Sequence, residues 1–309
     1  MPKTIQDIIS DVVSIQEDEI KILNSSKIFD MVDDLVNVAV FGSSNDKVKA
    51  RWLIWEMARH QNIIPSSIHD FYIARGREKL PLDFTVPAMN LRGMAYDMAQ
   101  AVFKTALKLN AGAFIFELAR SEMGYTDQSP SEYTTVILAA ALKLGWEGPV
   151  FIQGDHFQTK RAAPGVPADN EVETIKLLMQ EAMHYGFFNI DIDTSTLVDL
   201  DRATEELQQK PNIEYSAELA KFVRENEPKD ITVSLGGEIG HIGGKNSTIE
   251  DYEAYIEGFN AMMGDLTGMS KISIQTGTSH GGVVLADGSL ADINVDFKVL
   301  LDISRACRK

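Results

Sequence analysis

The sequence predicts an α/β protein: a TIM-type (β/α)8 barrel, present here as six β/α units, preceded by a helical N-terminal region. Three observations carry this prediction. From Phe84 onward short apolar runs alternate with helical stretches, each run ends in a polar or ionisable residue, and no Gly-rich phosphate turn follows the first run. We divide the chain into a helical region, residues 1–80, and a partial barrel, residues 81–309.

Residues 1–80 carry apolar side chains at helical spacing. The two clearest sets are Ile5, Ile8, Ile9, Val12 and Val13, and Ile28, Phe29, Val32, Leu35 and Val36. A third helix is expected over about 46–60, and a fourth from about Pro65. We expect these helices to pack on the part of the chain that follows.

Six strand–helix units come next. The expected strands are 85–90, 113–117, 150–156, 188–193, 231–235 and 271–275. The helix after the second strand has clear boundary signals, with Ser129 as N-cap, Pro130 at the first position and Gly145 after the end. Such alternation predicts a parallel sheet with crossover helices.

The number of strands and the first turn bear on the fold. Eight strands close a TIM barrel, and the pattern supplies six. A doubly wound sheet is the competing fold, but it requires a Gly-rich turn where this chain has Leu91-Arg92-Gly93-Met94. We therefore expect a barrel fragment whose open sheet edges leave it poorly stable and inactive alone.

Composition limits the classes of partner. Of the 309 residues, 44% are hydrophobic and 24% charged, and the net charge of −16 argues against nucleic acid or an anionic membrane as partner. No apolar run is long enough to cross a bilayer, and the N-terminus lacks a signal-peptide layout. The single cysteine, Cys307, excludes an internal disulfide and fits a cytoplasmic protein.

Residues able to do chemistry stand at the ends of the predicted strands, the face where barrel enzymes place their active sites. They are Asn90, Glu117, Asp155, His156, Asp193, Glu238 and His280. His156 and His280, with Glu238 on a strand between theirs, favour a divalent metal site, although two histidines are fewer than a catalytic zinc usually has. A strand-end Asp155 can also cap a loop, and His156 can pack in the rim.

Other residues near these strand ends can be interpreted either as functional or as purely structural. Gly281 and Gly282 would let backbone N–H groups approach an anion, or form a flexible turn. Ser195 could bind a substrate hydroxyl or close an ordinary Asx or Ser turn. Ser247 to Glu250 fit a capping box, which we prefer over a mobile-loop acid at Glu250.

Several motifs together resemble a known family. Gly-Asp-His at 154–156, Ile-Asp-Thr-Ser at 192–195, Gly-Glu-Ile-Gly-His-Ile-Gly-Gly at 237–244 and Gly-Thr-Ser-His-Gly at 277–281 occur in this order. They look like the class II, metal-dependent fructose-bisphosphate aldolase family, and Val86-Pro87-Ala88-Met89-Asn90 is similar to its first strand. The resemblance runs from about Phe84 to Lys309.

The resemblance implies a zinc-dependent aldehyde-lyase of carbohydrate metabolism, such as glycolysis. The expected reaction is reversible cleavage of a ketose bisphosphate into two triose phosphates. It implies Zn²⁺ or another divalent ion on His156 and His280, with Glu238 as a further metal position and Asp155 as proton donor and acceptor. Asn90, Ser195, Gly281 and Gly282 are expected to bind the sugar-phosphate substrate. We expect the complete protein to be a homo-oligomer, a dimer.

Departures from the family pattern leave an alternative open. Gln153 replaces a frequent His that is not usually a metal ligand, so this change is mild. Lys245-Asn246 stand where the family usually has an acidic pair, so no base for carbon deprotonation is identified. A third metal His and a second phosphate site normally lie on later strands. The alternative is a non-catalytic accessory subunit of the tagatose-bisphosphate aldolase type, in which Gly-Thr-Ser-His-Gly would not be expected.

Overall fold

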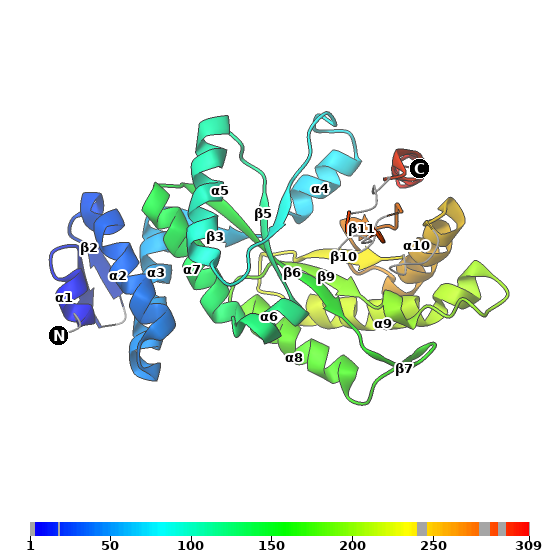
Figure 1. Ribbon diagram of the computed structural model, residues 1–309, viewed down its shortest axis with the longest axis horizontal. Coiled ribbons are helices and arrows are strands. Elements are labelled where there is room, and N and C mark those ends of the chain that lie inside the picture. Colours follow the sequence, from blue (N-terminus) through cyan, green and yellow to red (C-terminus); the bar gives the residue numbers. More distant parts are fainter. Residues whose placement is uncertain (1–3, 18, 240–245, 278–284, 290–294, 309) are drawn as a thin grey trace. The chain divides into compact units, whose positions relative to one another are not determined.

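The computed structural model describes residues 4–17, 19–239, 246–277, 285–289 and 295–308. The chain divides into two compact units. The first unit comprises Met1–Ser66, Thr85–Asp155 and Glu181–Phe188, and the second comprises Ser67–Phe84, His156–Gln180 and Asn189–Lys309. Figure 1 labels the elements along the chain, from blue at the N-terminus to red at the C-terminus.

The first unit contains parallel strands whose core is aromatic. β4 (Ala88–Asn90) pairs with β5 (Ile115–Ala119), and β5 pairs with β6 (Gly148–Gln158), whose last three residues belong to the second unit. All five residues of β5 are buried, as expected of a strand covered on both faces. Phe103, on α5 (Ala95–Leu109), packs against Phe114, Phe116 and Trp146 with ring centroids 5.0–5.8 Å apart.

Helices of the first unit pack around α7 (Pro130–Leu144). This helix has the predicted boundaries: Ser129 caps it, Pro130 starts it, and Gly145 ends it with φ of 65°. Eleven of its fifteen residues are buried. α2 (Ile28–Phe41) and α3 (Ser44–His60) both contact α7, and α5 does so as well. The remaining helices of this unit are α1 (Ile5–Ile9) and α6 (Arg120–Thr126).

The prediction of helices alone over residues 1–80 is wrong for three short segments. β1 (Val13–Gln16) and β2 (Glu19–Ile22) form an antiparallel hairpin, and β3 (Ile63–Ser66) pairs in parallel with β6. Both hairpin strands alternate apolar and polar residues, a period-two signal that the helical spacing of the preceding isoleucines masked. β3 is a short apolar run, which cannot be told from a helix start by periodicity. The boundary near residue 80 stays a prediction.

The second unit continues the parallel pattern. Its strands follow the order β6 end, β9 (Asn189–Asp193), β10 (Ser234–Glu238) and β11 (Lys271–Ser273). Its helices are α4 (His69–Gly76), most of α8 (Glu171–His184), α9 (Glu205–Asn226), α10 (Ile249–Met263) and α11 (Phe297–Ala306). A small antiparallel pair that the sequence did not predict, β7 (Arg161–Ala163) with β8 (Val166–Pro167), follows β6.

The α/β class and all six predicted strands are confirmed, with boundaries shifted by no more than three residues. Consecutive β/α units with parallel neighbours fit the predicted TIM-type barrel. The predicted cap of α10 is one residue off, because Thr248 rather than Ser247 is the N-cap, and its capping-box partner is Asp251 rather than Glu250. Within the described part of the chain, no helix is both long and apolar enough to span a membrane.

Candidate metal and active site

Three strand ends of the second unit present ionisable side chains close together. β9 and β10 run in parallel with Ile192 opposite Gly237. The next residues, Asp193 and Glu238, are the last of their strands and therefore lie side by side. His156 lies near the end of β6, the neighbour of β9. Because parallel strands end at the same edge of a sheet, these three side chains lie at one edge.

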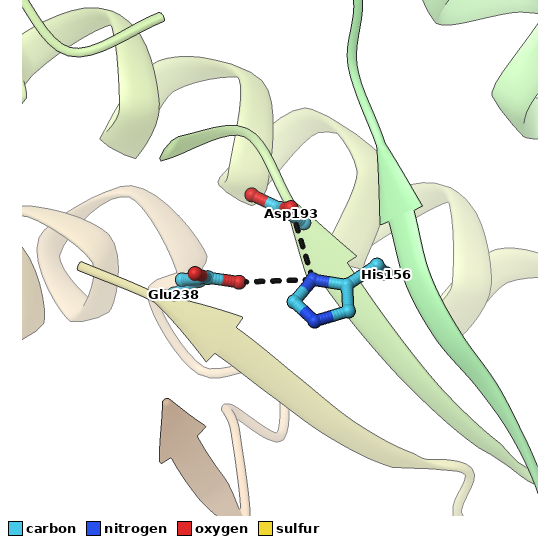
Figure 2. A group of neighbouring side chains, drawn as sticks. All are labelled: His156, Asp193 and Glu238. Carbon is cyan, nitrogen blue, oxygen red and sulfur yellow. Dashed lines mark hydrogen bonds and ion pairs between the residues drawn. The ribbon is translucent and has the colours of Figure 1, made fainter. Parts of the chain in front are cut away.

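His156 is the centre of this group (Figure 2). Its Nδ1 lies 3.1 Å from Oδ2 of Asp193 and 3.2 Å from Oε2 of Glu238. Its backbone has φ of 41°, in the left-handed region that a residue with a Cβ seldom occupies. Such backbone conformations cost free energy and persist where surrounding contacts impose them, frequently at functional sites.

Asp193 is almost fully buried and is held by several donors. Oδ1 accepts hydrogen bonds from the Ser195 backbone N–H (3.1 Å) and hydroxyl (2.7 Å), and Oδ2 accepts one from Nε2 of Gln158 (2.6 Å). Burial by itself would raise the pKa of Asp193, but the hydrogen bonds from His156, Ser195 and Gln158 outweigh it and leave the pKa lowered. Asp193 is therefore the member of the group that is held as a carboxylate.

The pKa of Glu238 is shifted in the opposite direction, upward. Burial raises its pKa, the hydrogen bond with His156 opposes that rise, and the nearby charge of Asp193 adds to it. The preceding residue, Gly237, is closely packed by two side chains. A Cβ on Gly237 would lie 2.4 Å from Sδ of Met269 and 2.6 Å from the hydroxyl of Tyr255. Met269 and Tyr255 thus pack against β10 and hold the strand that carries Glu238 in position.

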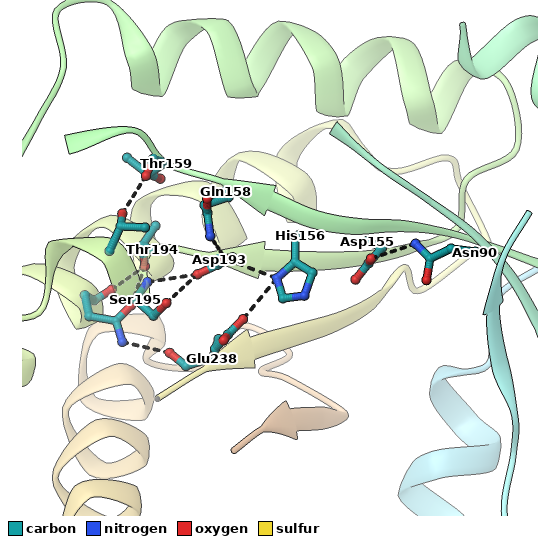
Figure 3. A network of polar contacts seen from close by, with 11 residues as sticks. Asn90, Asp155, His156, Gln158, Thr159, Asp193, Thr194, Ser195 and Glu238 are labelled. Carbon is teal, nitrogen blue, oxygen red and sulfur yellow. Dashed lines mark hydrogen bonds and ion pairs between the residues drawn. The ribbon is translucent and has the colours of Figure 1, made fainter. Parts of the chain in front are cut away.

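A buried polar network supports these strand ends, and Figure 3 shows the part of it around Thr194, Asp193 and Glu238. The Thr194 hydroxyl lies 2.6 Å from Oδ1 of Asn212 and 2.7 Å from Oγ of Ser216, both on α9. Nδ2 of Asn212 donates to the backbone carbonyl of Glu238 at 2.8 Å. Tyr255 on α10 donates to Ser216 at 2.9 Å. The network therefore joins β9 and β10 to two helices directly behind Asp193 and Glu238.

The group fits a divalent metal ion. One ligand atom each from His156, Asp193 and Glu238 lies within 4.8 Å of the others. Ligands at about 2.0–2.2 Å from a tetrahedral ion are roughly 3.4 Å apart, close to the two contacts of Nδ1. One imidazole and two carboxylates suit zinc and similar first-row ions. With two acidic groups and one imidazole, the group also has an excess of negative charge that a cation would neutralise.

In the first unit, Asp155 and Asn90 are hydrogen-bonded to each other. Nδ2 of Asn90 donates to Oδ2 of Asp155 at 2.9 Å and to Oε2 of Glu122 at 3.0 Å. Glu122 in turn forms an ion pair with Arg92 at 2.9 Å. Asn90 thus contacts the carboxylate proposed to move a proton, which its predicted role as a substrate ligand did not anticipate.

The structure brings some predicted site residues together and leaves others undescribed. His156 and Glu238 meet as predicted, whereas His280, Gly281 and Gly282 lie outside the described residues. Ser195 is buried and bonded to Asp193, the turn arrangement that the sequence also allowed. The role of each residue stays a prediction.

Sequence reasoning missed Asp193 as a possible metal ligand. The sequence did carry a signal, because Asp193 stands at a strand end as Asp155 and Glu238 do. We expected this segment to form a turn or to bind a substrate hydroxyl instead. Gln158 and Asn212 carried no signal, since only the folded chain brings them to Asp193 and Glu238.

Comparison with known families decides the relationship. A family model described as fructose-bisphosphate aldolase class-II matches residues 82–308, well over half of the chain. The chain belongs to this family. The match includes every strand end described above and excludes α2, α3 and β3.

Similarity to individual proteins is more distant. No curated protein matches the chain. Among solved structures, a probable tagatose 6 phosphate kinase from Sinorhizobium meliloti 1021 is similar with 13% sequence identity and a TM-score of 0.47. The similarity covers 68% of this chain and 53% of that one, so the chain spans about half the length of that protein.

Proposed function

We propose that the protein containing this aldolase-family chain catalyses reversible aldol cleavage of a ketose bisphosphate, of the fructose 1,6-bisphosphate type, into two triose phosphates with a divalent metal ion. The observation that carries the proposal is the contact of His156 with both Asp193 and Glu238, in a chain of this family. The same proposal includes a sugar-phosphate substrate, Zn²⁺ as the ion and a cytoplasmic location. It also includes a homo-oligomer, a dimer, as the state of the complete protein.

Within the proposal, His156, Asp193 and Glu238 hold the ion, with His280 as a further ligand. When bound, the ion would act as a Lewis acid toward the substrate ketone. Gln158 and Ser195 orient the Asp193 carboxylate, and Asn212 holds the backbone of Glu238. Such supporting contacts keep ligands in a binding geometry and commonly affect metal affinity when they are lost.

Asp155 is the proposed proton donor and acceptor for the hydroxyl next to the bond that breaks. It directly precedes His156 in the chain, and its Oδ2 accepts a hydrogen bond from Asn90. A fixed carboxylate is the type of group that general acid–base catalysis requires. Asn90, Ser195, Gly281 and Gly282 are the proposed substrate contacts, with the two glycines offering backbone N–H groups to a phosphate.

The second candidate function is that of a non-catalytic accessory subunit with the same fold. It is favoured by Gln153, which replaces a frequent His of the family and instead donates to Oε2 of Glu117 at 2.6 Å. An accessory subunit would need no proton-transfer group at Asp155. The two functions therefore differ in what substitution of Asp155 does.

The deciding experiment compares the parent chain, expressed as the full-length protein, with its Asp155→Asn and His156→Ala variants. Metal content is measured after purification and dialysis, and cleavage of fructose 1,6-bisphosphate is followed in a coupled triose-phosphate assay. We expect about one ion per parent chain, loss of the ion in His156→Ala, and a retained ion in Asp155→Asn with turnover reduced by about 10³-fold or more.

Turnover that survives in Asp155→Asn would contradict the proton-transfer role. A metal-loaded parent chain that turns over neither fructose nor tagatose 1,6-bisphosphate would favour the accessory function. A parent chain that binds no divalent ion would contradict the metal site itself.

A further inference from the structure

A cavity lies wholly within the first unit and has no part in the proposed reaction. Its volume is about 590 Å³, and it is lined by α3, the beginning of α7 and the residues at the end of α8. Small-molecule sites in proteins typically have about 300–1,000 Å³. One of its walls, α3, lies outside residues 82–308, so the cavity depends on a part of this chain that the family model does not include.

One end of the cavity is aromatic and preformed. It is lined by Trp52 and Trp55 of α3 and by His184 and Tyr185. Gly186, at φ of 82°, packs so closely on Trp55 that a Cβ would lie 3.0 Å from the indole. The Thr134 hydroxyl donates to the backbone carbonyl of Tyr185 at 2.7 Å. These contacts hold the ring-bearing segments in place before any ligand arrives.

Two basic side chains, Lys47 and Arg51, line the other end, and Arg51 is ion-paired with Glu132. Along α3, Lys47, Arg51 and Trp55 are spaced four residues apart and share one face, so Lys47 lies two turns from Trp55. Arg51 is fixed by hydrogen bonds to Ser131 (3.2 Å), to Glu132 (2.9 Å) and to the Ala39 carbonyl (3.0 Å). Burial raises the pKa of Glu132, and the charges of Arg51 and Lys47 act to lower it.

Charge is distributed unevenly along the cavity. Two carboxylates, Glu56 next to Trp55 and Glu181 one helical turn before Tyr185, line the cavity near its rings, whereas Lys47 and the hydroxyls of Ser129 and Ser131 line the other end. An anionic group is therefore repelled near the rings and attracted near Lys47. A ligand with a planar ring at one end and an anion at the other fits both ends in one orientation.

We propose that this cavity binds a small aromatic anion, with its planar ring against Trp52, Trp55 and Tyr185 and its phosphate or carboxylate beside Lys47 and Arg51. Ring stacking and cation–anion contact are each modest alone, and a preformed site combines them with little ordering cost. The inference is independent of the proposed aldol chemistry, because every lining residue belongs to the first unit and none is a proposed catalytic or metal-binding residue.

Tryptophan fluorescence of the full chain provides the test. The chain has three tryptophans, and the third, Trp146, is buried against Phe103 and Phe114, so an effect of ligand on Trp52 and Trp55 can be separated from it. AMP and phenylacetate serve as aromatic phosphate and aromatic carboxylate, and adenosine and ribose 5-phosphate supply the ring and the phosphate separately. We expect at least one aromatic anion to change the emission saturably and to bind about tenfold or more tighter than either separate part.

Substitutions locate the binding. Lys47→Gln should weaken it by about fivefold or more, whereas Lys49→Gln, an exposed lysine of the same helix that does not line the cavity, should leave it within about twofold. Trp52→Phe and Trp55→Phe should each reduce the fluorescence change, and Trp146→Phe should retain it. Thermal melting of every variant checks that it is folded.

Three results would overturn the proposal. The first is that neither AMP nor phenylacetate changes the tryptophan emission saturably up to about 10 mM. The second is that adenosine binds as tightly as AMP. The third is that Lys47→Gln does not weaken binding of the aromatic anion.

Discussion

At the residue scale, His156 contacts two carboxylates whose pKa values are shifted in opposite directions. Hydrogen bonds hold Asp193 ionised despite its burial, whereas burial makes Glu238 easier to protonate. In the absence of an ion, a proton on Nδ1 of His156 can be shared with both carboxylates, and a metal ion would replace that proton. The three residues together, rather than any one of them, determine the affinity for a cation.

Asp193 tests this reading directly. We expect Asp193→Asn to lower the affinity for Zn²⁺ by about 10–100-fold, because the amide keeps the shape but removes the charge of a ligand. Titration calorimetry with Zn²⁺ measures the change. Asp201→Asn, at an exposed carboxylate of the same unit, serves as control and should have no effect. Equal Zn²⁺ affinity in Asp193→Asn and the parent chain would remove Asp193 from the ligand set.

His69 gives the second unit a predicted pH dependence. Its side chain is 7% exposed, and Nδ1 has no hydrogen-bond partner among the residues that the structure describes. Burial and then the charge of Arg224 lower its pKa, although Asp70 and Glu227 oppose the shift. Because the folded-state pKa lies below the unfolded value of about 6.5, the unfolded chain takes up the proton first as pH falls. Stability is therefore complete above about pH 6.5 and decreases below it, until the folded-state pKa is reached.

The contribution of His69 can be measured by urea unfolding between pH 7.5 and 5.5. One proton changes the free energy of unfolding by at most about 1.4 kcal/mol per pH unit. His69→Gln should remove this part of the slope, whereas His60→Gln, at an exposed histidine of α3, should not. The assignment fails if the slopes of His69→Gln and the parent chain agree.

At the element scale, strand ends owe their positions to the helices behind them. Thr194 connects β9 to α9, Asn212 of α9 holds the carbonyl of Glu238, and Tyr255 of α10 bonds to Ser216. These groups are buried, so each lost partner leaves an unsatisfied polar atom. The network is therefore expected to influence both the stability of the second unit and the geometry of the metal ligands.

Thr194→Val separates these two effects. The nearly isosteric change removes the hydroxyl, and we expect the free energy of unfolding to fall by about 1–3 kcal/mol because Asn212 and Ser216 lose a partner. We also expect weaker Zn²⁺ binding. Thr135→Val is the matched control, since Thr135 is a fully buried threonine of α7 whose hydroxyl bonds to the Ser131 carbonyl. Denaturation and Zn²⁺ titration of both variants decide the outcome, and an unchanged Zn²⁺ affinity in Thr194→Val would show that the network is structural only.

At the scale of the whole molecule, the N-terminal region is an integral part of the first unit. α2 and α3 cover α7, and β3 adds a strand to β6, although all three precede the residues that the family model matches. Leu35 and Leu53 are fully buried in this region. The helices therefore supply core and do not merely precede the family region.

Removal of residues 1–66 should consequently leave an aggregated or loosely folded chain. The deletion exposes the apolar faces of α7 and removes the partner of β6 at residues 148–151. Size-exclusion chromatography and thermal melting measure the effect. Phe41→Ser, on a side chain that is 78% exposed, serves as control and should behave like the parent. A monodisperse deletion variant that melts cooperatively at the parent temperature would contradict this view.

Several features were determined by the sequence alone. Alternating apolar runs and helical patterns predicted the α/β class and all six strands, since burial on both faces requires continuous apolar residues. The local signals at Ser129, Pro130 and Gly145 predicted α7, because caps act over a few residues. Ordered motifs from Gly154 onward predicted the family. The meeting of His156 with Glu238 also followed, because parallel strands end at one edge.

Only the tertiary structure decided the remaining features. Asp193 joined the metal group, and Gln158 and Asn212 became its supports, through contacts between residues far apart in the chain or on different elements. β3 became a strand because β6 offered an edge, and the cavity beside Trp55 formed because α3, α7 and the end of α8 converge. Periodicity and capping report the local preference of a segment, whereas these features depend on which distant segment packs against it.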